Sequence, residues 1–118
     1  MLGSYVRFRD NSLYPDDFFE VKAVNSDINM VFLSDIDMWV DESAIVIDKD
    51  VKIFISKRVD GNSEPLILND IFNSPLIFEN KEDAFDYMSE SNSNITSLSD
   101  FFNLKLSFLP IKLIAMNK

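Results

Sequence analysis

The 118-residue chain contains no cysteine and no histidine. Without cysteine there are no disulfides, no thiolate metal ligands and no cysteine nucleophile, and a reducing, cytoplasmic setting is the natural expectation. Without histidine the chain lacks the commonest general base and the commonest metal-binding side chain. We therefore expect no bound metal ion.

Glycine is almost as scarce, with only Gly3 and Gly61 in the whole chain. A phosphate-binding loop or a dinucleotide fingerprint needs several glycines at fixed spacing, so neither is present. No Gly-x-Ser-x-Gly nucleophile elbow occurs either. Together these absences predict a protein that is not an enzyme and that carries no cofactor.

Long apolar runs are also missing, since none approaches the ~20 residues that a membrane-spanning helix needs. The amino end lacks the basic segment and apolar core of a secretory signal. The chain is instead rich in acidic residues, with 20 Asp and Glu against 11 Lys and Arg and a net charge of −9. Residues 1–50 hold eleven acidic and four basic side chains, so the excess lies mainly in the first half. Such a field attracts basic protein surfaces and repels nucleic-acid phosphates, although net charge also serves solubility alone.

The first half of the sequence predicts a small β structure. Apolar and polar residues alternate from Phe19 to Ala23, with Phe19, Val21 and Ala23 on the side expected to be buried. Short polar turns separate the further apolar runs, which is typical of closely spaced strands in a small barrel or curled sheet. Strands are expected at residues 1–9, 19–24, 29–33, 38–40 and 44–47, with one 3₁₀ turn at 41–43.

Short motifs in this half resemble those of the SH3-like small β-barrel superfamily. They are Gly-x-x-Val-Arg-Phe at 3–8, Phe-Glu-Val at 19–21, Met-Val-Phe-Leu at 30–33, and Trp39-Val40 followed by Ser43-Ala44-Ile45. The resemblance covers residues 3–48 and implies a barrel with a 3₁₀ turn before its last strand. Members bind peptides, cell walls, nucleic acids or modified protein tails. The Ala-Leu-Tyr-Asp-Tyr motif of the peptide-binding branch is absent here, which argues against binding of proline-rich peptides.

The second half predicts a lobe of its own after a polar boundary at 48–50. Period-two alternation and a glycine-containing turn predict a β-hairpin, followed by a further short strand and a last strand. These strands are expected at residues 51–57, 65–68, 76–78 and 104–116. Pro110 lacks an amide donor and implies a bulge, a bend or an edge position in the last strand.

Two helical segments are expected between these strands. Asn80 has the chemistry of an N-cap for a helix at 81–90, whose core face carries Ala84, Phe85 and Met88. Thr96 or Ser97 caps a second short helical turn. The expected fold class is α+β and mostly β, with an SH3-like barrel at 1–49 and a ββ(β)αβ lobe at 50–118 that packs against it and shares one core.

The candidate binding residues surround the only tryptophan. Trp39 is flanked by Asp37 and Asp41, and Glu42 follows. Tryptophan anchors protein interfaces and acidic neighbours attract basic partners, and the resemblance implies that the residue at this place faces a ligand groove. A packed core position for Trp39 stays equally open.

A second candidate group lies in the loop before the second strand and consists of Tyr14, Asp16 and Asp17. Tyr14 is either an exposed aromatic contact or a lid over the end of the barrel. Two groups of carboxylates have the oxygen atoms that a hard cation needs. One consists of Asp16, Asp17 and Glu20, and the other of Asp35, Asp37, Asp41 and Glu42. Because their spacing is not that of a calcium-binding loop, solvated turns are the preferred interpretation.

Three function classes remain open. The first is a non-catalytic module, such as an inhibitor or an immunity or anti-defence protein, that docks on a basic surface of another protein. The second is a KOW or Tudor-like nucleic-acid module, for which the barrel offers only Arg7, Arg9 and Lys22 as a basic patch. The third is a structural subunit of a phage particle or a homo-oligomer. Frequent Asn, Ile, Lys, Phe and Ser indicate an AT-rich genome, such as that of a low-GC bacterium or its phage.

Overall fold

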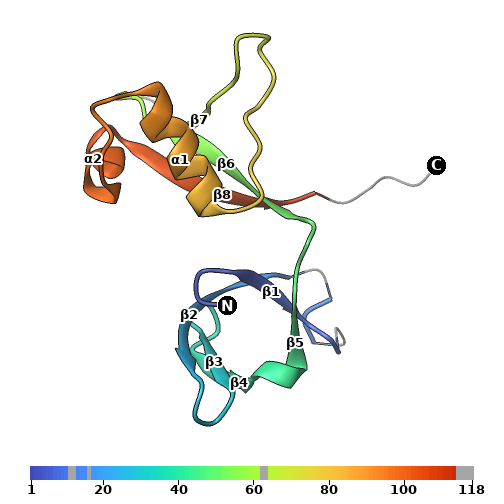
Figure 1. Ribbon diagram of the computed structural model, residues 1–118. Coiled ribbons are helices and arrows are strands. Elements are labelled where there is room, and N and C mark those ends of the chain that lie inside the picture. Colours follow the sequence, from blue (N-terminus) through green and yellow to red (C-terminus); the bar gives the residue numbers. More distant parts are fainter. Residues whose placement is uncertain (11–12, 16, 62–63, 114–118) are drawn as a thin grey trace, which may run out of the picture. The chain divides into compact units, whose positions relative to one another are not determined.

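The computed structural model describes residues 1–10, 13–15, 17–61 and 64–113 (Figure 1). The chain forms two compact units, Met1–Val51 and a second one that begins at Lys52. Strands predominate over helices, so the fold is α+β and mostly β, as the sequence predicts. None of the helices in the described residues has the length and the apolar run needed to cross a membrane.

The first unit is built from short antiparallel strands. They are β1 (Tyr5–Phe8), β2 (Phe19–Asn25), β3 (Met30–Leu33), β4 (Met38–Asp41) and β5 (Ile45–Ile47), with a 3₁₀ helix, Glu42–Ala44, between the last two. The strands form one five-stranded sheet in the order β4-β3-β2-β1-β5. Every strand overlaps its predicted range, although β1 is shorter than predicted.

A bulge in β2 changes the direction of this sheet. The start of β2 pairs with β1, the rest pairs with β3, and the register shifts between Val21 and Ala23. The extra residue places Ala23 opposite Phe32, whereas Val21 lies opposite Leu33. Residues directly opposite one another face the same side of a sheet. Ala23 therefore faces outward with Phe32, which corrects the prediction that it lies on the buried side, because a bulge shifts the alternation by one residue.

The strands curve around a common apolar interior (Figure 1). All five contribute to it, through Val6, Phe19, Val21, Val31, Leu33, Val40 and Ile45. Within the described residues the edge strands β4 and β5 are not hydrogen-bonded to each other, so the sheet is curled without being closed by a ladder.

The second unit combines a smaller sheet with helices. Its elements are β6 (Val51–Lys57), β7 (Leu66–Ile67), α1 (Lys81–Ser91), α2 (Leu98–Asn103) and β8 (Leu106–Lys112), with β6 in the centre of a three-stranded sheet. The predicted hairpin is confirmed by the antiparallel pairing of β6 with β7. The strand predicted at 76–78 is reduced to a single bridge between Phe78 and Ile53, because the helix cap at Asn80 follows two residues later and leaves no length for a ladder.

Both predicted helix starts are confirmed. The side chain of Asn80 accepts a hydrogen bond from the backbone N–H of Asp83 at 2.8 Å, and that of Ser97 accepts one from the N–H of Asp100 at 3.2 Å. Phe101 of α2 is fully buried and stacks on Phe108 of β8 with ring centroids 4.6 Å apart. β8 has a neighbour on one side only in the described part of the sheet, which is where Pro110 is tolerated.

The core of the first unit predicts a sharp contrast between two leucines. Leu33→Ala removes a fully buried side chain and is expected to lower the free energy of unfolding by about 2–5 kcal/mol. Leu13→Ala, at a side chain that is 82% exposed, is expected to change it by no more than ~0.5 kcal/mol. Denaturant titration followed by the fluorescence of Trp39 reports on this unit, and equal effects of the two substitutions would contradict the assignment of the core.

The hydroxyl of Tyr5 donates a hydrogen bond to Oε1 of Glu20 at 3.0 Å, across the β1–β2 pair. Burial of the hydroxyl, followed by the negative charge of Glu20, raises the pKa of Tyr5 above its ordinary value of 10.0. The neutral phenol is therefore favoured by folding. The resulting stability is complete below the unfolded pKa and is lost as pH rises through the folded one.

We expect the wild-type chain to lose stability more steeply than Tyr5→Phe as pH rises above about 10. Phenylalanine keeps the ring but has no proton to release, so this pH-dependent loss disappears. Denaturant midpoints measured at about pH 9 and pH 12 check this, and parallel losses in the two proteins would show that Tyr5 is not the group responsible.

Candidate functional site

Trp39 lies on the outer face of β4 and its side chain is 47% exposed. Its neighbour Val40 is 7% exposed and points into the interior, as alternation along a strand requires. Directly across the β3–β4 pair lies Phe32, whose ring centroid is 5.4 Å from that of Trp39 at an interplanar angle of 49°. Of the two alternatives for Trp39, the structure therefore shows the surface position.

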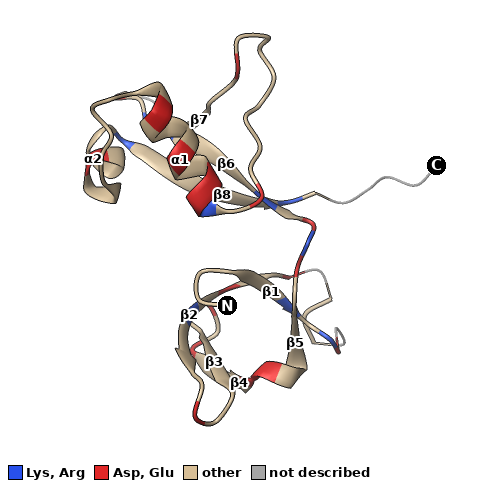
Figure 2. Cartoon of the chain, viewed as in Figure 1, with Lys and Arg blue, Asp and Glu red and all other residues tan. Residues whose placement is uncertain are grey.

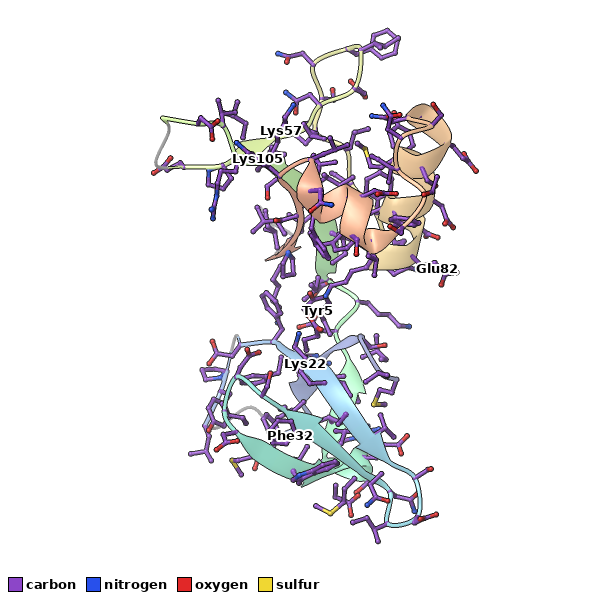
Figure 3. The ribbon with its side chains drawn as sticks, turned by 90° about the vertical axis from the view of Figure 1, so that its left-hand side faces the viewer. Tyr5, Lys22, Phe32, Lys57, Glu82 and Lys105 are labelled. Carbon is purple, nitrogen blue, oxygen red and sulfur yellow. The ribbon has the colours of Figure 1, made fainter. Side chains whose placement is uncertain are left out.

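The outer side of β2, β3 and β4 carries an apolar strip around this ring pair. One row across the strands consists of Ala23, Phe32 and Trp39, and the next consists of Asn25, Met30 and Asp41. Phe32 and Met30 are half-buried, and Figure 3 shows Phe32 on this side of the sheet. We call the surface formed by Ala23, Met30, Phe32, Trp39 and Asp41 the Trp39 face.

Asp41 stands at the end of β4 and caps the 3₁₀ helix that follows. Its Oδ1 accepts hydrogen bonds from the hydroxyl of Ser43 at 2.7 Å and from the backbone N–H of Ser43 at 2.9 Å. These two donors, the hydroxyl first, lower the pKa of Asp41 below its ordinary value. Asp41 is therefore a fixed negative charge at neutral pH.

The other carboxylates lie close to Asp41 in the chain, at either end of β4. Asp37 is exposed and ends the turn before the strand, with φ 52° and a hydrogen bond from its N–H to the carbonyl of Ser34 at 3.2 Å. Glu42 is exposed in the 3₁₀ helix after the strand (Figure 2). Arg9 donates from Nε to the carbonyl of Ser43 at 2.9 Å, which places one guanidinium beside this acidic end.

In the second candidate group, Tyr14, Asp16 and Asp17, the aromatic residue does not form an exposed contact surface. Tyr14 is half-buried, stacks on Phe8 at 5.4 Å and meets Phe19 edge to face at 5.4 Å. Of the two alternatives for Tyr14, the structure therefore shows the lid, because Phe19 of the core and the neighbouring Phe8 offer its ring more contact than water does. Asp17 is exposed, and Asp16 lies outside the described residues.

The acidic side chains do not form a cation site in the described ranges. No three Asp, Glu, His or Cys side chains there come together in a group that suits a metal ion. Glu20, which the sequence grouped with Asp16 and Asp17, forms an ion pair with Lys22 at 2.8 Å and accepts the hydrogen bond of Tyr5.

Sequence reasoning missed the apolar members of the Trp39 face. Alternation within residues 30–33 places Met30 and Phe32 on one face of the strand and Val31 and Leu33 on the other. This is the signal in the sequence that indicates an outward position for Met30 and Phe32. The partner of Phe32 across the pair follows only from the length of the turn between β3 and β4.

Comparison of the chain with protein-family models, curated proteins and solved structures gives no significant match.

The cap at Asp41 leads to a pH-dependent prediction. Ser43→Ala removes the hydroxyl donor and is expected to raise the pKa of Asp41 toward its ordinary value. A carboxylate whose folded pKa is lowered stabilises the fold above its unfolded pKa, and this stability is lost as pH falls through the folded value. The destabilisation by Ser43→Ala is therefore expected at neutral pH and should vanish in acid.

Carboxyl resonances followed by NMR from about pH 2 to 6 measure this directly. Asp100 is an internal control, because the hydroxyl and the backbone N–H of Thr96 lower its pKa in the same way. Its titration should be unchanged in Ser43→Ala. An unchanged Asp41 titration would show that the Ser43 hydroxyl does not hold this carboxylate.

Proposed function

We propose that Met1–Val51 is a small barrel of the SH3-like kind. Three observations support this: the strand order, the bulged β2 that pairs on both sides, and the 3₁₀ helix directly before β5. A bulge at which one strand turns from one pairing to the next is the usual way to curl a short sheet. The position of the 3₁₀ helix is the one that the resemblance in residues 3–48 implies.

We further propose that the chain is a non-catalytic protein-binding module that docks the Trp39 face on a basic surface of another protein. The observation that carries this proposal is the half-exposed Trp39, which lies on Phe32 with carboxylates at both ends of its strand. A tryptophan whose ring already packs against a neighbouring ring supplies apolar contact with little loss of side-chain freedom on binding. Carboxylates around it speed association with a positive surface and select against negative ones.

An inhibitor or an immunity or anti-defence protein is the form of this function that we favour. Such a protein acts by covering a basic surface of its target, so it needs charge complementarity and an anchor rather than chemical groups. The chain has a net charge of −9, and it lacks histidine, the commonest general base, and cysteine, one of the catalytic nucleophiles.

Binding of nucleic acid is disfavoured because two of the three basic residues that it needs already contact other groups of the chain. Lys22 is paired with Glu20 at 2.8 Å, and Arg9 is engaged with the carbonyl of Ser43. Binding to phosphates needs several cations that act together against an otherwise repulsive field. Arg7 is exposed on β1 and is the remaining member of that patch.

The test uses the purified chain as immobilised bait against lysates of low-GC bacteria. We expect a specific captured protein, with capture falling as salt rises, because charge contributes to association. Trp39→Ala is expected to weaken binding of that protein by ~2 kcal/mol or more, about 30-fold, as for a tryptophan at the centre of an interface. Ile47→Ala is the matched control, since Ile47 is 46% exposed in the same unit, and it should bind normally.

Gel-shift experiments with RNA and DNA at low salt separate the alternatives. A shift that is lost on Arg7→Ala would favour the nucleic-acid module and would argue against the proposal. Equal binding by Trp39→Ala and Ile47→Ala would show that the Trp39 face is not the contact surface.

A further inference from the structure

The second unit presents two large apolar side chains at the end of a loop. Ile71 is 92% exposed and Phe72 is 80% exposed, within the segment that joins β7 to α1. Isolated apolar groups on a protein surface are common, but adjacent ones at this exposure are typical of contact sites. We call Ile71 and Phe72 the tip.

The loop that carries the tip is held by its own hydrogen bonds. Oδ1 of Asp70 accepts from the backbone N–H of Phe72 at 2.8 Å and from that of Ser74 at 3.0 Å, and the N–H of Asp70 donates to the carbonyl of Ser74 at 2.8 Å. Asn73 adopts the left-handed conformation, φ 64°, that closes this turn. Because the turn is already formed, little conformational entropy is lost when the tip is bound.

The charge around the tip is negative. The loop between β7 and α1, residues 68–80, carries Asp70 directly before the tip and no Lys or Arg, and its other acidic residue, Glu79, is paired with Lys52. Figure 2 shows no basic residue along the loop. Segments that insert into membranes rely on Lys and Arg next to their apolar residues, because the lipid surface is negative. The tip therefore suits an apolar pocket with a positive rim.

The same unit contains a pocket of that kind. An open surface pocket of about 250 Å³ is lined by Arg58, Phe102, Lys105, Leu106 and Ser107. It lies where the end of β6 meets the start of β8, since the N–H of Arg58 donates to the carbonyl of Lys105 at 3.0 Å. Figure 3 shows Lys105 beside Lys57 at this place.

The pocket combines apolar walls with positive charge. Leu106 is buried beneath it, and Phe102 is 51% exposed, which leaves half of its side chain available to a ligand. Lys105 is paired with the exposed Asp60, so Arg58 is the main source of positive charge. A guanidinium in the lining also offers a cation–π contact to an aromatic ring that enters the pocket.

We propose that the tip of one copy of the chain binds in the pocket of a second copy, so that the second unit mediates self-association. A cavity of about 150 Å³ is known to hold benzene, so this one has room for the ring of Phe72. The negative charge of Asp70 beside the tip is opposite to that of Arg58 at the pocket, which makes the two surfaces complementary in charge as well as in size. The exposure of Phe72 shows that the tip does not occupy the pocket of its own chain. A reciprocal exchange closes into a dimer, whereas a one-way contact gives longer assemblies. This inference does not depend on the Trp39 face.

Light scattering coupled to size exclusion tests the proposal on the whole chain. We expect mass to increase with concentration up to about 1 mM, since a contact made by one aromatic anchor has an affinity at the weak end of the range. Phe72→Ala is expected to weaken the association at least ~10-fold. Leu13→Ala, which alters an apolar side chain of similar exposure in the first unit, should associate as the wild type does.

The pocket is tested by Arg58→Glu and Phe102→Ala, and both are expected to abolish association at concentrations where the wild type dimerises. Leu98→Ala is the control for Phe102→Ala, because Leu98 lies in the same helix with the same exposed fraction of 51%. Arg58 is exposed, so Arg58→Glu is expected to fold normally. It therefore tests the pocket independently if Phe102→Ala does not fold.

Mixing two defective variants gives the decisive result. Phe72→Ala keeps the pocket and Arg58→Glu keeps the tip, so each alone should be monomeric, while the mixture restores one tip–pocket contact and should associate at the upper end of the concentration range. A wild-type chain that stays monomeric throughout the concentration range overturns the proposal. So does a mixture that fails to associate, or a Phe72→Ala chain that dimerises normally, because the tip then serves another partner.

Discussion

The first unit depends on one change of direction in β2. At the shift between Val21 and Ala23 the strand passes from its pairing with β1 to its pairing with β3. Strands this short cannot form an interior as a flat sheet, because their apolar side chains would lie in one open layer. The bend brings Val6 and Ile45 of β1 and β5 into the same cluster as Val31 of β3, and this shared burial stabilises every other element of the unit.

The same bend decides what the outside of the sheet looks like. It places the small side chain of Ala23 opposite Phe32, and Phe32 in turn supports Trp39. The tryptophan is thus oriented by a neighbour while 47% of it stays exposed. In the proposed function this arrangement separates two roles, since the carboxylates at the ends of β4 act at long range and the ring acts on contact.

The second unit organises its surface in another way. Its core is made by helices that pack on a sheet, around Phe101 and Phe108, while Ile71 and Phe72 are held away from it by the side chain of Asp70. Because the turn is ordered by its own hydrogen bonds, these apolar groups stay exposed. In a less ordered loop they would fold back onto the unit. The proposed self-association would bury them without any change in the loop.

Local pattern by itself determined where most strands and both helices lie, because alternation and capping act between residues that are close in the chain, as Asn80 shows. It also identified Trp39 and its acidic neighbours as the candidate surface. Only the tertiary structure decided that Trp39 faces outward, that Tyr14 covers the core, and that Asp48, expected at a polar boundary, is 4% exposed with its N–H bonded to the carbonyl of Tyr5. Burial is the sum of contacts with segments distant in sequence, so no local pattern contains it.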